Sequence, residues 1–365
     1  MTDTQKLVQE TIDELVATGA ETGLQVAAYR AGELVVDAVA GVADTATGRP
    51  VTSATPFFAT SVGKGVASTV VHVLAERGVL SYDRPVAELW PEFAAHGKGD
   101  ATLRHALTHT VGVPGVPADT TPEAMVDWER MCATLAAAEP WWEPGTRTGY
   151  HALTFGWIVG EVVRRATGRT IGQVLRDEVA APLGVADEIY FEVPADRLPA
   201  LAVLEEQPRA ADMLASLPPD LPMFKTAPAA VFPGAGLYNR ADFLRAGIPA
   251  GATTTARAIA RMYAALLGEV DGVRLISPER LAEVTSVAYS GVDEVFGNPV
   301  TWALGYGIEK PEERPGRFGF VGVGGTVAHA DTESGLTFAL MRNKFAFGDV
   351  SAAERLDAVV AASGA

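Results

Sequence analysis

The stretch PFFATSVGKGVASTVV, residues 56–71, decides the fold of this chain. An apolar entry leads through small residues into a segment whose valines recur at helical spacing. If a helix begins at Ser61, Lys64 lies one turn further along the same face, which brings an amine to a hydroxyl. A lysine in this place is one way to activate a serine nucleophile without histidine. Taken alone, the pattern is more often a serine that caps a helix and a lysine in solvent.

Composition limits the classes of protein that the chain can belong to. Of its 365 residues 48% are hydrophobic and 20% are charged, which is typical of a globular protein with a large core. The formal charge of -16 argues against nucleic acids and anionic membrane surfaces as partners. The single cysteine, Cys132, cannot form an internal disulfide.

The N-terminal residues suggest where the protein resides. Residues 1–6 contain no apolar run and no small-residue cleavage site, so we expect no secretory signal and a cytoplasmic location. We also expect no segment that spans a bilayer. The sequence leaves the oligomeric state open.

The order of predicted elements suggests a sheet made from both ends of the chain. We expect a helix over 3–18, a strand hairpin over 24–41, and the Ser61 helix ending at Arg77-Gly78. Late in the chain we expect a closing helix over 350–362, preceded by strands over 302–309, 317–322, 325–331 and 335–343.

The middle of the chain differs in composition from its two ends. Proline and glycine are dense there and strand-like runs are scarce, with a firm helix over 155–167 and an irregular covering loop over 193–235. We therefore predict an α+β fold. Residues 1–80 and 255–365 would form a sheet domain with flanking helices, and 81–254 an inserted, mainly helical domain. Ser61 would lie at the junction, where substrate clefts are common.

Two further segments carry candidate functional residues. In WEPGTRTGYHAL, residues 142–153, a Pro-Gly turn leads to Tyr150 just before a helix. In FGFVGVGGT, residues 318–326, glycines allow close approach of a ligand to the backbone.

With these segments the chain resembles the serine hydrolases of the class C β-lactamase and penicillin-binding-protein superfamily, and within it the family VIII carboxylesterases. The resemblance covers nearly the whole chain and implies a β-lactamase/transpeptidase-like fold. It rests on the Ser61–Lys64 box, the Leu107-Thr108-His109-Thr110-x-Gly112 loop, Pro144-Gly145 with Tyr150, the 155–168 helix, Pro182-Leu183-Gly184, and the glycine-rich strand with Ala330-Asp331.

The resemblance implies a mechanism that needs no cofactor. Ser61 would attack an acyl carbonyl and form an acyl-enzyme. Lys64, desolvated and at least partly neutral, would act as base, and Tyr150 would exchange protons with Ser61 and the leaving group, its phenolate favoured by the lysine. The backbone N–H groups of Ser61 and of Val323, on the late strand, would hold the oxyanion. The alternative for Tyr150 is an ordinary packed tyrosine.

Two departures from the family pattern narrow the substrate. True β-lactamases carry Tyr-x-Asn, and here Ala152 stands in place of the asparagine. Their Lys-Thr-Gly box reads Phe320-Val321-Gly322 here, so no cation is left for a substrate carboxylate. We therefore expect neutral ester substrates, with Phe320 and Gly322 as candidate substrate-binding residues.

Other candidates for the site are aromatic or histidine residues. His151 could polarise Tyr150 or line the pocket, although a histidine facing away is the commoner arrangement. His109 fits a structural hydrogen-bonding role. No cluster has metal-ligand spacing, and we predict no metal. Since most aromatic residues are core, we expect about a third of the following candidates to face an acyl group. They are Trp141, Trp142, Trp302, Phe224, Phe232 and Tyr238.

These observations leave several activities open. A serine esterase acting on small esters leads. An acyltransferase or amide-forming enzyme of secondary metabolism would use the same acyl-enzyme, and nothing in the sequence separates water from another acceptor. A β-lactamase or D-amino-acid peptidase is weakened by Ala152 and Phe320. A non-enzymatic binding module is disfavoured because Ser61, Lys64 and Tyr150 are all present.

Overall fold

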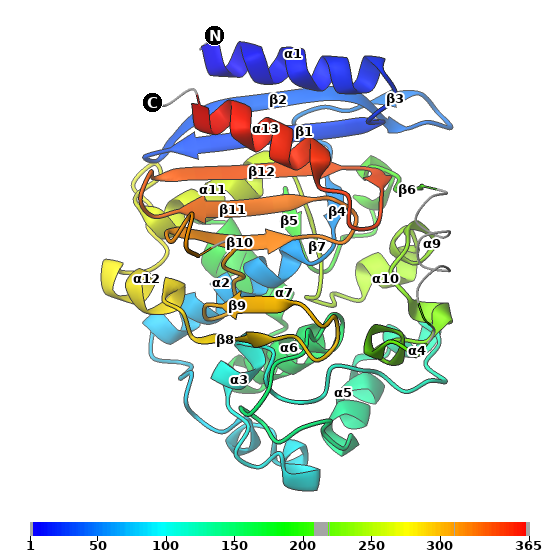
Figure 1. Ribbon diagram of the computed structural model, residues 1–365, viewed down its shortest axis with the longest axis vertical. Helices are drawn as coiled ribbons and strands as arrows, with labels where there is room; N and C mark the ends of the chain where they lie inside the picture. Colours follow the sequence, from blue (N-terminus) through cyan, green and yellow to red (C-terminus); the bar gives the residue numbers. More distant parts are fainter. Residues whose placement is uncertain (1–2, 208–217, 219, 310, 363–365) are drawn as a thin grey trace.

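A six-stranded antiparallel sheet, built from both ends of the chain, is the frame of the molecule (Figure 1). The computed structural model describes residues 3–207, 218, 220–309 and 311–362. The strand order is β10-β11-β12-β1-β2-β3, and β1 pairs with β12 so that Ala27 lies opposite Ala339. The strands are β1 (Gly23–Arg30), β2 (Glu33–Asp44), β3 (Arg49–Pro50), β10 (Arg317–Val321), β11 (Val327–Asp331) and β12 (Leu336–Arg342).

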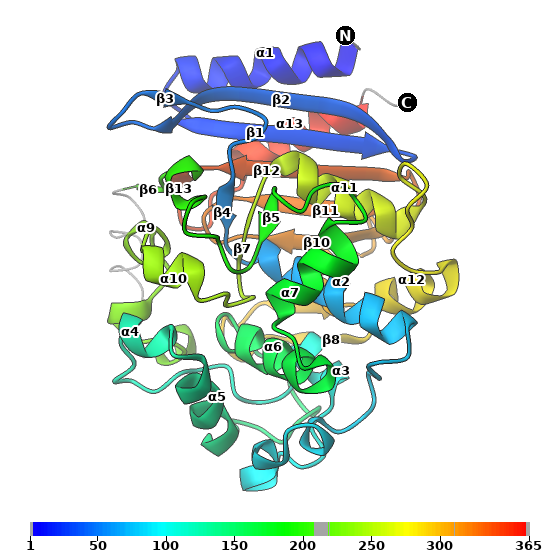
Figure 2. The ribbon, with the colours of Figure 1, turned by 180° about the vertical axis from the view of Figure 1, so that it is seen from behind.

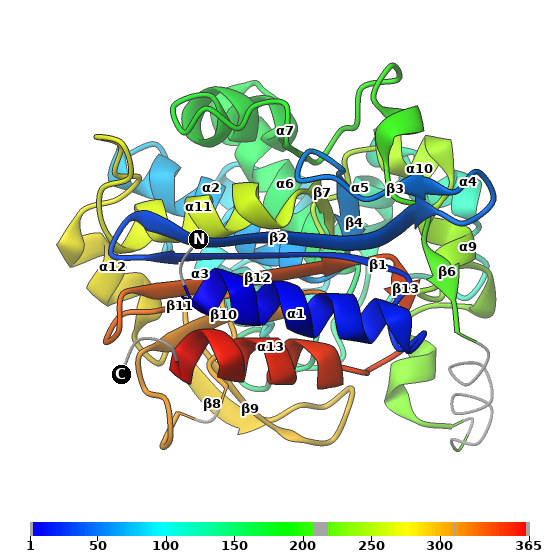
Figure 3. The same cartoon turned by 90° about the horizontal axis from the view of Figure 1, so that it is seen from above.

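Helices cover both faces of this sheet, which explains why its central strands are apolar throughout. Every residue of β12 is buried, and in β1 only the last residue is not. On one face lie α1 (Asp3–Ala17) and α13 (Ser351–Ala362), side by side in the view from above (Figure 3). On the other face α11 (Ala256–Leu267) packs against β1, β11 and β12. The predicted α+β class and the sheet from both chain ends are confirmed.

The helix that follows Ser61, α2 (Val62–Glu76), runs through the interior between the sheet and the helical region (Figure 2). All of its residues except the last are buried, as expected for a helix that is apolar on every side. It packs against β10, β7 (Ala252–Thr254) and α6 (Thr154–Thr167). It ends at Glu76, one residue before the predicted Arg77-Gly78, and Gly78 takes the left-handed conformation that often ends helices.

The middle of the chain forms the lower, helical part of Figure 1, and one hydrophobic core continues from the sheet into it. The division at residues 80 and 254 therefore stays a prediction. The helices here are α3 (Leu103–Leu107), α4 (Pro122–Met125), α5 (Trp128–Ala137), α6 (Thr154–Thr167), α7 (Ile171–Leu175), α9 (Ala235–Tyr238) and α10 (Ala241–Arg245). A small sheet joins β4 (Phe57–Ala59), β7 (Ala252–Thr254) and β5 (Ile189–Tyr190) just before Ser61.

The structure differs from the sequence prediction at a late strand. The predicted strand over 302–309 is wrong, since the strand is β9 (Pro299–Trp302), paired with β8 (Tyr289–Val292). After β9 the chain turns, with Gly305 at φ +76° and the Ala303 N–H bonded to the carbonyl of Tyr306 (2.9 Å). The remaining elements are α12 (Pro278–Thr285), β6 (Glu205–Glu206) and β13 (Lys344–Phe345).

The predicted covering loop, residues 193–235, is described only in part. Residues 208–217 and 219 of that loop lie outside the described residues. Its described portion is irregular apart from β6 and short 3-10 turns. Among the described helices, none has the length and apolar character needed to cross a membrane.

Candidate active site

Ser61 and Lys64 lie side by side at the start of α2. Ser61 stands at the N-cap position, yet its side chain makes no capping hydrogen bond. Lys64 is fully buried, and its Nζ lies 3.3 Å from the Ser61 Oγ while it donates to the carbonyl oxygen of Ala250 (3.2 Å). The ordinary alternative needed a capping serine and a solvated lysine. Neither condition holds.

Burial sets the protonation of the Lys64 amine. It lowers the pKa of Lys64 to about 7, because a charged ammonium loses its hydration inside the protein. In the described part of the chain no carboxylate pairs with Lys64 to oppose this effect. A large fraction of Lys64 is therefore neutral near pH 7 and able to accept the Ser61 proton.

Tyr150 completes the cluster from the loop before α6. Its phenol hydrogen-bonds the Ser61 hydroxyl, and the Lys64 Nζ lies 4.9 Å from the centre of its ring. Burial raises the pKa of Tyr150 above its ordinary value, more than the Ser61 hydrogen bond lowers it. The expected phenolate is thus replaced by a neutral phenol, which can donate a proton. In this cluster the Lys64 amine is the group that can accept a proton near pH 7.

Aromatic rings fix the Tyr150 ring in place. Trp302 stacks on it, with centroids 5.9 Å apart and planes at 10°, and His109 contacts it at 4.7 Å. His109 has a positive φ of 57° and accepts the His151 backbone N–H at Nδ1 (3.2 Å). This agrees with the structural hydrogen-bonding role expected for His109. Burial holds its pKa well below the usual range, so the ring is neutral.

His151 points into the protein matrix and contacts backbone at both ring nitrogens. Its Nδ1 donates to the Gly149 carbonyl (2.6 Å), and its Nε2 accepts the Val113 N–H (3.1 Å). Burial lowers the pKa of His151 to about 4. With both nitrogens occupied and its side chain outside the pocket lining, His151 has no group free for a substrate.

Val323 lies in the tight turn that joins β10 to β11, not on a strand as predicted. The Gly322 N–H donates to the Thr326 carbonyl (2.7 Å), and the Gly348 N–H donates to the Val323 carbonyl (2.8 Å), so the turn is held from two sides. Within the described residues, neither the Val323 nor the Ser61 N–H enters a turn or cap hydrogen bond.

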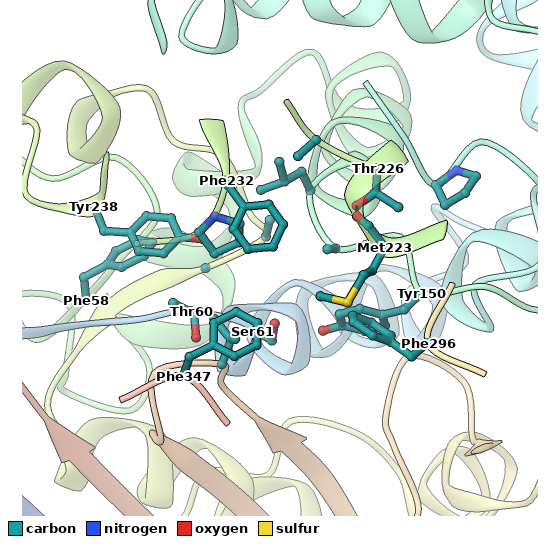
Figure 4. Close-up of a pocket in the computed structure, with 18 of the residues that line it drawn as sticks. Phe58, Thr60, Ser61, Tyr150, Met223, Thr226, Phe232, Tyr238, Phe296 and Phe347 are labelled. Carbon is teal, nitrogen blue, oxygen red and sulfur yellow. Dashed lines mark hydrogen bonds between the residues drawn. The ribbon is translucent and has the colours of Figure 1, made fainter. Parts of the chain in front are cut away.

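Ser61, Tyr150 and Val323 open into one pocket, shown in Figure 4. It encloses about 730 Å³, including the space at its open mouth. Among the described residues, none that lines the pocket carries a charge. Besides Tyr150, its aromatic lining consists of Phe58, Phe232, Tyr238, Phe243, Phe296 and Phe347.

Several predicted pocket residues lie elsewhere. Phe232 and Tyr238 line the pocket, whereas Trp141, Trp142, Trp302 and Phe224 do not. Trp142 is buried and donates from Nε1 to the Thr110 carbonyl (3.2 Å). Phe320 is buried against Trp302, with ring centroids 6.3 Å apart. Gly322 lies under the Thr60 and Thr326 hydroxyls, which occupy the place of a Cβ.

Comparison with known proteins agrees with this geometry. A family model described as beta-lactamase matches residues 8–362. The chain belongs to the beta-lactamase family. It is 35% identical over 333 residues to the esterase/beta-lactamase LipL of Mycobacterium tuberculosis, covering 88% of this chain and 77% of that protein.

Solved members of the family share the whole fold. A family VIII carboxylesterase structure superposes with a TM-score of 0.90 at 34% identity, covering 99% of this chain and 98% of that one. A penicillin-binding protein homologue from Caulobacter crescentus gives 0.84 at 33% identity over the same shares. The expected resemblance to the superfamily, and to family VIII carboxylesterases within it, is confirmed.

Some residues that line the pocket were not predicted from the sequence. They come from segments that lie far apart in the chain. Phe58 lies within the stretch 56–71, three residues before Ser61, and that spacing alone could have indicated it. Phe243, Phe296 and Phe347 follow no motif, so only the tertiary fold brings them to Ser61.

Proposed function

We propose that the protein is a serine carboxylesterase that hydrolyses small neutral esters through an acyl-enzyme on Ser61. The observation that carries this proposal is the buried Lys64 amine, 3.3 Å from the Ser61 Oγ at the base of an uncharged pocket. The similarity to an esterase/beta-lactamase and to a family VIII carboxylesterase supports it.

The proposed reaction has two halves. In the first, neutral Lys64 takes the Ser61 proton as the Oγ attacks the ester carbonyl, and the Ser61 and Val323 N–H groups stabilise the oxyanion. Tyr150 gives its proton to the departing alkoxide and recovers one through Lys64. In the second half, water attacks the acyl carbon, the same groups move its proton, and the acid and free Ser61 are released.

The lining of the pocket supports neutral, apolar acyl groups as substrates. A carboxylate buried against aromatic side chains without a cation would lose its hydration uncompensated. Ala152 lines the pocket where the family's asparagine would stand, and Phe320 lies outside it. This favours esters over β-lactams and D-amino-acid peptides, which carry a carboxylate and an amide.

The proposal is tested with p-nitrophenyl acetate and butyrate, using the parent protein and Ser61→Ala. We expect ester hydrolysis by the parent and its loss in the variant by at least about 10³-fold. Full activity in Ser61→Ala would refute the proposed nucleophile. Cephalosporin turnover faster than ester turnover would favour a β-lactamase instead.

The acyl acceptor is tested separately. Adding alcohols or amines to the ester assay measures how the acyl-enzyme divides between hydrolysis and transfer. We propose water as the acceptor, so the free acid should dominate, whereas an excess of transfer product would favour the acyltransferase alternative.

We further propose a cytoplasmic location and no nucleic-acid or membrane partner. The support is the single cysteine and the charge of -16. Fractionation of cells that express the protein tests the location.

A further inference from the structure

The β8–β9 hairpin carries a buried carboxylate that the proposed reaction does not use. Asp293 is 1% exposed, and within the described residues no lysine or arginine pairs with it. Burial raises the pKa of Asp293, and hydrogen bonds from backbone N–H groups, which favour the ionised form, oppose that rise. Oδ1 accepts those of Val295 (2.8 Å) and Phe296 (2.9 Å), and Oδ2 accepts that of Tyr150 (2.8 Å). Oδ1 thus closes the turn that contains Asp293, and Oδ2 bonds the segment that carries the Tyr150 phenol.

A second set of contacts joins the same two segments. The Glu294 N–H donates to the Thr148 carbonyl (2.9 Å), beside a parallel bridge between Thr148 and Asp293. From the far end of the hairpin, Trp302 donates from Nε1 to the Thr148 hydroxyl (3.1 Å) and stacks on the Tyr150 ring. The hairpin therefore holds Tyr150 at both its backbone and its ring.

We propose that Asp293 is a positioning residue for Tyr150, whose backbone it fixes so that the phenol meets the Ser61 hydroxyl. The assignment rests on the proposed function, since it presumes that Tyr150 transfers the proton. Loss of this one contact frees the Tyr150 backbone, four residues before α6, from its carboxylate partner, while Trp302 still stacks on the ring. A displacement of a reacting group by about 1 Å lowers turnover by about 10²-fold.

The charge of Asp293 has a second effect at the same atom. Burial is the largest cause that raises the pKa of Tyr150, and the negative charge of Asp293 adds to it. Among the described residues, the other polar groups near the ring are the Ser61 hydroxyl, Lys64 on α2, His109 and the Tyr238 phenol. Lys64 and His109 are neutral above about pH 7, and burial raises the pKa of Tyr238, so its phenol is neutral as well. Asp293 thus adds to the effect of burial, which is the main reason that the phenol stays protonated, and removal of its charge should lower the pKa of Tyr150.

The test is Asp293→Asn, assayed with p-nitrophenyl butyrate across pH. In this variant the amide N–H₂ group of the asparagine must face one of the backbone N–H groups from which the Asp293 carboxylate accepts a hydrogen bond. We expect kcat to fall about 10²-fold with a much smaller change in KM. The alkaline limb of the rate profile should move to lower pH, while the limb near pH 7 set by Lys64 stays in place. In a Tyr150→Phe background the same change should have little further effect.

Asp331→Asn is the matched control. Asp331 also accepts two backbone N–H groups of its own turn, those of Glu333 and Ser334, but makes no contact with Tyr150. Asp331→Asn should leave kcat and both limbs of the pH–rate profile unchanged. If Asp293→Asn does not fold, Asp293→Ser, whose hydroxyl can still accept one N–H, is measured in the same way.

The outcomes separate this inference from the function on which it rests. If Ser61→Ala or Tyr150→Phe keeps full activity, the proposed reaction is wrong whatever Asp293 does. If those variants lose activity while Asp293→Asn keeps the kcat and pH limbs of the parent, the positioning role is overturned. An equal loss in the parent and Tyr150→Phe backgrounds also overturns it, because Asp293 would then act on the fold alone.

Discussion

At the scale of single residues, the division of labour between Lys64 and Tyr150 follows from their surroundings. Lys64 is fully buried and Tyr150 is partly buried, and the loss of hydration disfavours the charged form of each, so the amine loses its proton readily and the phenol keeps its own. In the proposed reaction the pair therefore starts as a neutral base and a neutral acid. Two groups whose pKa values are moved in this way are a common basis for acid–base assignments.

The rate should therefore depend on the ionisation of Lys64. Because only the neutral amine accepts the Ser61 proton, kcat/KM for p-nitrophenyl acetate should rise about tenfold per pH unit below the pKa and level off above about 7. Stopped-flow acylation rates between pH 5 and 9 measure this. A rate that is flat across pH 7, or that rises only near the ordinary lysine pKa, would contradict a desolvated Lys64.

At the scale of elements, the helices below the active site are tied together by one buried carboxylate. Glu161 on α6 accepts from Trp128 of α5 (2.9 Å) and from both Arg164 and Arg165. Burial alone would raise its pKa, but these hydrogen bonds hold it at about 2. Since Ser61 rests on α2, which packs against α6, this network supports the floor of the site.

Glu161→Gln should destabilise the fold by about 2 to 3 kcal/mol, because two arginines lose their charged partner. The pKa of Glu161 is lower in the folded state than its ordinary 4.5, so its contribution is present above that pH and is lost as pH falls towards about 2. The difference between parent and variant in urea unfolding should shrink over that window. Glu129→Gln, which removes a largely exposed partner of Arg164, is the control and should change little. Equal stability of Glu161→Gln and the parent would contradict the network.

The segment that covers the pocket should set the length of the acyl group. Phe232 lines the pocket and packs on Phe224 (centroids 5.9 Å apart) and Phe347 (6.2 Å). Phe232→Ala should therefore raise the kcat/KM ratio of octanoate to acetate esters by about 10-fold. Phe224→Ala, which removes a neighbour outside the lining, should not. An unchanged ratio in Phe232→Ala would place the acyl group elsewhere.

At the scale of the whole molecule, one core joins the sheet to the helical region, so we expect them to unfold together. Five of the six tryptophans lie between residues 81 and 254. Tryptophan fluorescence therefore reports mainly on the helical region, while far-UV circular dichroism reports on the secondary structure of the whole molecule. The two signals should give one coincident thermal transition. Separate transitions would support two independent domains.

The features of the fold and the site that could be predicted from the sequence are those that depend on short stretches of the chain. The Ser61 helix, the first and last helices and the sheet from both ends follow from periodicity and motif. Ala152 and Phe320 led to the expectation of neutral substrates, and Ala152 lines the pocket whereas Phe320 does not. Asp293, Phe296 and Phe347 could not be predicted, because their roles depend on hairpins and turns brought to Ser61 from distant segments. The neutral phenol of Tyr150 could not be predicted either, since it depends on burial.

The central claim, an acyl-enzyme on Ser61, is tested most directly by intact mass after a fluorophosphonate probe. The parent should gain one adduct, mapped to the peptide that contains Ser61, and Ser61→Ala should gain none. Ser68→Ala, two turns along the same helix with its hydroxyl bonded to the Lys64 and Gly305 carbonyls, should label like the parent. An adduct that persists in Ser61→Ala, or that maps to another residue, would contradict the account.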